Sequence, residues 1–220
     1  MKYFKRSLFT IILLGSILSI TQCKDNDVPP DNDPENPEEP NLPEGFYFGA
    51  DLSYVNQVLD YNGIFLDQGE ERSPYKIFKD HGTNLVRLRL WHNPTWTMEV
   101  YGEEGTQMYS DLFDVEKSIG LAKAQGMEVL LDFHYSDTWA DPGHQDVPAA
   151  WKDISDIEVL KDSVYQYTKQ TLEYLNGKGL MPELVQIGNE TNCGMMTSEA
   201  GEDFPGMNVC DGNWSNMGDV

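Results

Sequence analysis

The chain has few basic residues. Its 220 residues include 15 Lys and Arg against 37 Asp and Glu, which gives a formal net charge of -22 at pH 7. Such a charge repels a phosphate backbone, and no stripe of Lys and Arg with interleaved aromatic residues is present, which disfavours nucleic acid as a partner. A neutral polymer is an easier partner for this chain than an anionic one.

Cysteine is also scarce. The three cysteines are Cys23, Cys193 and Cys210. The last two lie in one loop-like stretch and could form a disulfide, but a sequence does not give the distance between their Cα atoms. Pairing of Cys193 with Cys210 therefore stays open at this point.

The apolar run at residues 8–20 is too short to cross a bilayer comfortably. Basic residues precede it and Cys23 follows it, so residues 1–22 resemble the signal peptide of a bacterial lipoprotein, with Cys23 as the acylated first residue of the mature chain. Gln22 departs from the small residue usual at that point, and plain secretion with cleavage elsewhere is the alternative. A lipid on Cys23 would anchor the protein to a membrane without spanning it.

Residues 23–44 are rich in Pro, Asp and Glu and offer almost nothing to bury, which predicts a stiff, solvated linker. The acidic residues directly after Cys23 resemble the surface-export signal of Bacteroidetes lipoproteins. We therefore expect an outer-membrane lipoprotein that is exposed at the cell surface.

From residue 46 onward, short apolar segments alternate with segments of helical spacing. The pattern predicts strands at residues 46–53, 84–91, 127–136 and 182–190, and helices at residues 73–82, 111–126 and 156–179. Such alternation implies parallel βαβ units, which fit either a doubly wound sheet or a (β/α)8 barrel.

The position of the polar residues separates these two folds. They cluster at the carboxyl ends of the predicted strands, which in a barrel converge on one mouth. A doubly wound dinucleotide-binding sheet is disfavoured because no glycine-rich phosphate loop follows the first strand. The sequence therefore predicts an α/β chain containing about the first four βα units of a (β/α)8 TIM barrel, with polar side chains at the mouth: Asp51, Ser53, Arg87, Arg89, His92, residues 132–137, Asn189 and Glu190.

Four segments carry a specific resemblance: GADLSYV, LVRLRLWHNP, LLDFHYSDTWADPGHQDVPAAW and QIGNE. In this order and spacing they closely resemble the endo-β-1,4-galactanases of glycoside hydrolase family 53, from about residue 45 to residue 192. The resemblance implies a (β/α)8 barrel that hydrolyses β-1,4-galactan, the side chain of pectic arabinogalactan, with retention at the anomeric carbon. Residues 45–220 would form the amino-terminal part of that domain.

The resemblance also assigns roles. Glu190 matches the acid/base residue, and Asn189 matches the amide that hydrogen-bonds the sugar 2-hydroxyl. Protonation by a carboxylic acid turns the glycosidic oxygen into a workable leaving group, so an acid at this strand end is chemically apt. For an isolated GNE triplet the simpler interpretation would be a Glu that leaves a strand.

Retention needs a second carboxylate as nucleophile. The family carries it on the seventh strand, and no residue before Val220 corresponds to it. The acidic residues near the mouth, Asp51, Asp132, Asp137 and Asp141, match family residues that bind and orient.

Arg87 and Arg89 alternate with leucines, so both should point to one face, where two guanidinium groups need partners. One interpretation is that at least one of them keeps the nucleophile ionised, and we favour Arg89 because it is nearer the carboxyl end of the strand. The alternative, a structural ion pair inside the barrel, fits Arg87 nearly as well.

Tryptophans offer flat apolar faces for a galactose ring, or they pack in the core. Trp139 lies between Asp137 and Asp141 in a polar loop, so it is the tryptophan least expected in the core, compared with Trp91 and Trp151. The sugar hydroxyls would then be bound by Asp132, His134, Ser136, Asp137 and Asp141.

No cofactor is evident, and His134 has no second histidine at metal-ligand spacing, which favours a sugar contact or a structural hydrogen bond over a metal. Some family members hold calcium in a loop beyond residue 220. Trp214, in the Gly- and Met-rich tail, either contacts substrate or begins a helix. Two alternatives to a galactanase remain: a non-catalytic galactan-binding half-barrel, and a related endo-glycanase for another β-linked polysaccharide.

Overall fold

A computed structural model describes residues 45–100 and 103–197. The signal peptide and linker expected at residues 1–44, Cys210 and Trp214 lie outside the described residues. Among the residues that the structure describes, no helix has the length and apolarity to cross a membrane.

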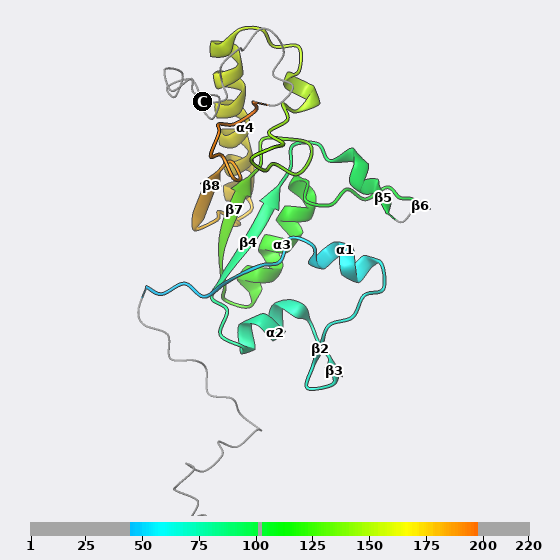
Figure 1. The fold of residues 1–220 in the computed structure, drawn as a ribbon. Coiled ribbons are helices and arrows are strands. Elements are labelled where there is room, and N and C mark those ends of the chain that lie inside the picture. The colour runs from blue at the N-terminus through cyan, green and yellow to red at the C-terminus, as the bar shows by residue number, and fades with distance from the viewer. Residues whose placement is uncertain (1–44, 101–102, 198–220) are drawn as a thin grey trace, which may run out of the picture. The chain divides into compact units, whose positions relative to one another are not determined.

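The centre of the fold is a parallel sheet in the order β1-β4-β7-β8, of which Figure 1 labels β4, β7 and β8. Its strands are β1 (Gly49–Asp51), β4 (Leu85–Leu90), β7 (Glu128–Phe133) and β8 (Leu184–Ile187). Each strand pairs with the one that precedes it in the sheet, and all three pairings are parallel. A doubly wound sheet reverses its strand order at a switch point, whereas this sheet grows in one direction, as the wall of a (β/α)8 barrel does. The predicted fold is confirmed.

Three of the helices begin and end where the sequence predicts. Pro74 opens α2 (Pro74–Asp80), while Asp111 caps α3 (Leu112–Ala124) and Asp156 caps α4 (Ile157–Gly177) by accepting hydrogen bonds from backbone N–H groups of the first turn. Gly126 and Gly179 follow α3 and α4 with φ of +70° and +71°, a conformation that glycine adopts without strain. Figure 1 shows α3 and α4 beside the strands that they connect.

The loops contain a short helix, hairpins and 3-10 turns that the sequence pattern did not predict. Their shortness leaves too few residues for a periodic pattern to show. They are α1 (Val55–Asp60), the hairpin of β2 (Leu66–Asp67) and β3 (Glu70–Glu71), the hairpin of β5 (Glu99–Val100) and β6 (Glu103–Glu104), and the 3-10 turns η1 (Thr95–Met98) and η2 (Ala149–Trp151).

The first strand is shorter than the predicted 46–53 because a side chain replaces part of its ladder. The Asn84 amide donates to the Phe46 carbonyl at 2.7 Å and accepts from the Phe48 N–H at 2.7 Å. Regular pairing with β4 therefore begins only at Gly49, opposite Leu85.

The two faces of the sheet differ in polarity. On the helix-covered face, alternate residues of β4 and β7 have exposed fractions of 1% or less: Val86, Leu88, Leu90, Val129, Leu131 and Phe133. They pack in one cluster with Ile119 of α3 and Leu160 of α4. The intervening residues Arg87, Arg89 and Asp132 therefore face the other side, the barrel interior, and this confirms that both arginines share one face.

Candidate active site

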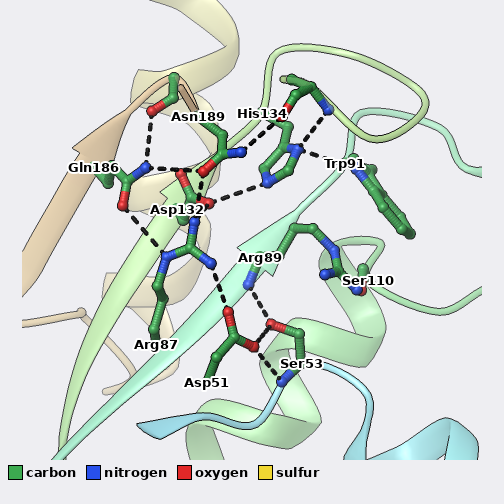
Figure 2. A network of polar contacts seen from close by, with 12 residues as sticks. Asp51, Ser53, Arg87, Arg89, Trp91, Ser110, Asp132, His134, Gln186 and Asn189 are labelled. Atoms are coloured by element: carbon green, nitrogen blue, oxygen red, sulfur yellow. Dashed lines mark hydrogen bonds and ion pairs between the residues drawn. The ribbon is translucent and has the colours of Figure 1, made fainter. Parts of the chain in front are cut away.

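The carboxyl ends of the four strands meet in one polar network with Arg87 at its centre (Figure 2). The Arg87 guanidinium donates from Nη1 to Asp51 Oδ2 at 2.5 Å and from Nη2 to Asn189 Oδ1 at 2.8 Å. Nη2 also pairs with Asp132 Oδ2, and Nε donates to Gln186 Oε1 at 3.3 Å. One side chain of β4 thus joins residues of β1, β7 and β8.

Asp51 is fixed from two sides. Its Oδ1 accepts hydrogen bonds from the Ser53 hydroxyl at 2.6 Å and the Ser53 N–H at 3.0 Å, while its Oδ2 faces Arg87. Burial works to raise the pKa of Asp51, but the hydrogen bonds from Ser53 and Arg87 outweigh it and lower the pKa overall. Asp51 is therefore ionised at neutral pH and balances the Arg87 charge.

The proton of the neutral His134 ring can be placed from its neighbours. Nδ1 accepts hydrogen bonds from the Ala140 N–H at 3.1 Å and the Trp91 indole N–H at 3.3 Å, so the proton must be on Nε2. Nε2 lies 3.1 Å from Asp132 Oδ2. Burial lowers the pKa of His134 and outweighs the opposing effect of Asp132, so the imidazole is neutral.

Asn189 is buried and its side-chain amide is held at both ends. Oδ1 accepts from Arg87 at 2.8 Å and from Gln186 Nε2 at 3.4 Å, and Nδ2 donates to the Ala140 carbonyl at 2.7 Å. The Asn189 backbone carbonyl accepts from Gln145 Nε2 at 2.8 Å. Among the residues that the structure describes, the second N–H of the Asn189 amide has no partner, which leaves it for a ligand.

Glu190 follows directly and is exposed. Within residues 45–100 and 103–197, no hydrogen bond or ion pair engages its carboxylate. Its φ of +50° is unusual for a residue with a side chain and costs on the order of 1–3 kcal/mol, a strain that is concentrated at functional sites. Gly188 makes the sharp exit from β8 possible, because a Cβ there would lie 2.4 Å from Thr191 Cγ2.

Arg89 occupies a different environment from Arg87. It is 1% exposed, and its Cζ lies 4.2 Å from the ring centroid of Trp91, 4.4 Å from that of Tyr54 and 4.8 Å from that of Trp139. Nη2 donates to Ser110 Oγ at 3.3 Å, and Nε has no hydrogen-bond partner in the described part of the chain. Burial lowers the pKa of Arg89, although an arginine stays charged.

The two arginines therefore have different environments, and only one of them forms the ion pairs that the sequence suggests. Arg87 forms the ion pairs inside the barrel, and Arg89 is a buried cation surrounded by aromatic rings. That Arg89 keeps a nucleophile ionised stays a prediction.

The tryptophans differ in the exposed fraction of their side chains. Trp139 is 39% exposed, whereas Trp151 is 8% exposed and Trp91 is only 1% exposed. The expectation that Trp139 is the least buried of these three is confirmed, whereas the Trp91 ring packs inside the protein and presents no face to solvent. The sequence pattern missed Trp96, which is 52% exposed and whose indole N–H donates to the Asp137 carbonyl at 2.9 Å. Its position in a polar loop after a strand was the same signal that singled out Trp139.

The predicted hydroxyl-binding residues of the loop after β7 already have protein partners. Asp137 accepts from the backbone N–H of Asn93 at 2.9 Å and of Ala149 at 2.8 Å, which ties three loop segments together. Asp141 accepts from the Gly143 N–H at 2.7 Å and pairs with His144, and its pKa is lowered chiefly by the Gly143 hydrogen bond.

Asp132, His134 and Ser136 are each at most 2% exposed. A strand-end polar residue looks the same in sequence whether it faces a ligand or an internal network, so this burial could not be foreseen. Direct sugar contacts from these residues stay predictions.

Within the described residues, no group of three or more His, Cys, Asp or Glu side chains could hold a metal ion. Cys193 forms a disulfide; Cys210, whose pairing with it the sequence leaves open, lies outside the described residues.

The known proteins that are similar to this chain include members of one family of glycosyl hydrolases. A family model described as "Glycosyl hydrolase family 53" matches residues 47–220. An arabinogalactan endo-beta-1,4-galactanase of Cellvibrio japonicus is 49% identical over 154 residues, which cover 70% of this chain and 38% of that protein. An endo-beta-1,4-galactanase of Bacillus subtilis is 40% identical over 154 residues, which cover 68% of this chain and 34% of that protein. The chain thus spans between a third and two fifths of the length of these relatives.

A solved structure agrees. The GH53 catalytic domain of Ignisphaera aggregans superposes with a TM-score of 0.64 at 34% identity, covering 79% of this chain and 45% of that domain. At this identity the shared fold and the sequence similarity support each other.

Proposed function

This chain belongs to glycosyl hydrolase family 53, and we propose that the protein is a retaining endo-galactanase that cleaves β-1,4-galactosidic linkages in the (arabino)galactan side chains of pectin. The observation that carries the proposal is the exposed Glu190 beside the fixed Asn189 amide at the carboxyl end of β8. The galactanases at 49% and 40% identity support the same activity.

In this mechanism Glu190 donates a proton to the glycosidic oxygen as the bond to the anomeric carbon breaks. It then acts as a base toward the water that hydrolyses the glycosyl-enzyme. Asn189 supplies its free N–H to the sugar 2-hydroxyl, a contact that strengthens as the ring approaches the oxocarbenium-like transition state.

The nucleophile has to be a second carboxylate roughly 5–5.5 Å from the first. The family resemblance assigns it to a glutamate beyond residue 220. Asp51 and Asp132 are poorly suited to act as the nucleophile because each carboxylate forms an ion pair with Arg87.

The exposed aromatic side chains at the mouth are the expected contacts for the substrate. The exposed indoles of Trp139 and Trp96 suit the C–H faces of galactose rings. The net charge of -22 suits a neutral polysaccharide better than an anionic one, so we propose that binding concerns the galactan branch and not the charged pectin backbone.

We also propose that the protein is an outer-membrane lipoprotein anchored at Cys23. The support is the order of basic residues, apolar run and cysteine within residues 1–23, followed by the acidic linker. Incorporation of labelled palmitate, lost in Cys23→Ala, would test this; equal labelling of the variant would disprove the anchor.

The activity is tested by release of reducing sugar from β-1,4-galactan, with β-mannan and cellulose as comparison polymers. Two proteins are assayed, residues 24–220 and the product of the same gene read through to its next stop codon, each with a Glu190→Gln control. Cleavage of galactan that is lost in the control supports the proposal.

Other outcomes identify the alternatives. Cleavage of mannan or cellulose instead would indicate another endo-glycanase. Binding of galacto-oligosaccharides in calorimetry without hydrolysis would indicate a galactan-binding protein. Activity of residues 24–220 alone would show that a carboxylate before Val220 replaces the family nucleophile.

A further inference from the structure

The orientation of an asparagine amide is a physical question because its oxygen and nitrogen ends have similar size and opposite hydrogen-bonding character. For Asn189 the two orientations have different consequences. One leaves an N–H for the substrate, and the other would turn the nitrogen toward Arg87 and leave the oxygen facing Ala140.

The neighbours of Asn189 permit only one orientation. Arg87 can only donate, and its Nη2 lies 2.8 Å from Asn189 Oδ1. The Ala140 carbonyl can only accept, and it lies 2.7 Å from Asn189 Nδ2. A rotated amide would place N–H against N–H at Arg87 and oxygen against oxygen at Ala140.

Gln186 reinforces this arrangement, and its own amide is also fixed by Arg87. Its Oε1 accepts from Arg87 Nε at 3.3 Å, so its Nε2 is directed to the Gly188 carbonyl at 3.0 Å and to Asn189 Oδ1 at 3.4 Å. Arg87 thus acts on Asn189 directly and through Gln186 (Figure 2).

Arg87 is itself immobilised by carboxylates on both sides. Nη1 binds Asp51, and Nη2 binds Asp132 as well as Asn189, so four of its five N–H groups have partners. Lysine has no planar fork and could not reach the same acceptors in the same directions.

From this geometry we infer that Arg87 is a positioning residue, which orients the Asn189 amide so that an N–H is presented to the substrate beside Glu190. The inference rests on the proposed function, in which Asn189 donates to a sugar hydroxyl. Arg87 itself has no direct contact with the substrate in this role.

The role predicts a particular kinetic signature. Because the Asn189 contact strengthens in the transition state, its loss lowers kcat more than it raises KM. In the full gene product acting on β-1,4-galactan, Arg87→Lys should lower kcat roughly 10- to 100-fold, the usual scale for a misplaced catalytic contact. KM should change less than about threefold.

The decisive comparison is a double-mutant cycle with Asn189→Ala. If Arg87 acts through Asn189, then Arg87→Lys should have less than about a threefold effect on kcat once the amide is gone. An equal loss of kcat in both backgrounds would overturn the inference. Arg72→Lys is the matched control, because Arg72 also pairs with two carboxylates, Asp67 and Asp80, but belongs to the segment after the β2–β3 hairpin and not to the four-stranded sheet. It should keep wild-type kcat.

A milder variant serves if Arg87→Lys fails to fold. Gln186→Ala removes one contact to Asn189 Oδ1 and the acceptor of Arg87 Nε, and it leaves both ion pairs of Arg87 intact. It should lower kcat in the same direction by a smaller factor, and again only while Asn189 is present. A wild-type kcat for Gln186→Ala would overturn the inference.

A measurement without substrate separates this inference from the proposed activity. In protein labelled with 15N-asparagine, the Asn189 side-chain signals are identified by their loss in Asn189→Ala. Hydrogen exchange of the Asn189 N–H that is bonded to the Ala140 carbonyl should be slow in the wild type and faster in Arg87→Lys or Gln186→Ala. If the wild type fails to cleave galactan, the proposed function fails, and unchanged exchange in these variants would separately overturn the role of Arg87.

Discussion

The backbone of Ala140 connects His134 to Asn189, since its N–H donates to His134 Nδ1 at 3.1 Å and its carbonyl accepts from Asn189 Nδ2 at 2.7 Å. The loop after β7 therefore fixes the tautomer of a buried imidazole and the orientation of a strand-end amide with a single residue. The neutral, Nε2-protonated form of His134 is a condition for this arrangement, because a proton on Nδ1 would oppose the Ala140 N–H.

This condition predicts a dependence of stability on pH. Burial lowers the pKa of His134 in the folded protein, so the unfolded chain takes up the proton first as the pH falls below about 6.5, the ordinary value for histidine. Stability is then lost as the pH falls from that value toward the lowered folded pKa. His134→Gln, which cannot titrate, should show a smaller fall in the urea midpoint between neutral and mildly acidic pH than the wild type does.

The control for that experiment is His144→Gln, because His144 is an exposed loop residue paired with Asp141. It should retain the wild-type pH dependence of the urea midpoint. If His134→Gln also follows the wild-type curve, the imidazole is not held neutral by burial.

Substitution of the buried Trp91 should mainly lower stability, whereas substitution of the more exposed Trp139 should mainly weaken substrate binding. Trp91 is 1% exposed, so Trp91→Ala should lower the free energy of unfolding by about 3–5 kcal/mol, the usual cost of removing a large buried aromatic ring. Trp139 is 39% exposed, and Trp139→Ala should cost less than half as much stability while raising KM for galactan. Urea unfolding and initial rates over a range of galactan concentrations measure the two effects. An unchanged KM in Trp139→Ala would remove it from the sugar-binding surface.

Sequence alone predicted the barrel wall because strand and helix periods are local properties of the chain. Residue type and spacing predict that α3 and α4 begin at Asp111 and Asp156. They also predict the polar residues at the carboxyl ends of the strands: Asp51, Asp132 and Asn189. The partners of Arg87 and Arg89 could not be predicted, because both residues share one face of β4. Register places Arg89, and not Arg87, opposite Asp132, yet the Arg87 side chain crosses diagonally to β7 and brings its Nη2 to that carboxylate. Such diagonal contacts depend on three strands at once.

Asp137 offers a test of whether a predicted sugar ligand is a structural residue. Its two carboxylate oxygens accept from the backbone N–H of Asn93 and of Ala149. Asp137→Ala should therefore lower the free energy of unfolding by at least about 1.5–3 kcal/mol, the contribution of one hydrogen bond to a charged group. The expected measurement is a lower urea midpoint. A full wild-type midpoint together with a raised KM for galactan would instead identify Asp137 as a sugar ligand.

Glu190 can be assigned as the acid by varying the leaving group of the substrate. Glu190→Gln should lower kcat on β-1,4-galactan by about 100- to 10,000-fold, the usual contribution of general acid–base catalysis. Dinitrophenolate is expelled from a dinitrophenyl β-galactoside without protonation, so the step that forms the glycosyl-enzyme should proceed in the variant almost as in the wild type. This step would appear as a burst of dinitrophenolate. Glu173→Gln is the matched control, because Glu173 is an exposed residue of α4 whose ion pair with Lys169 contributes little. An equal loss of the burst and of galactan hydrolysis in Glu190→Gln would mean that Glu190 is not the acid, since an acid is required only where the leaving group must be protonated.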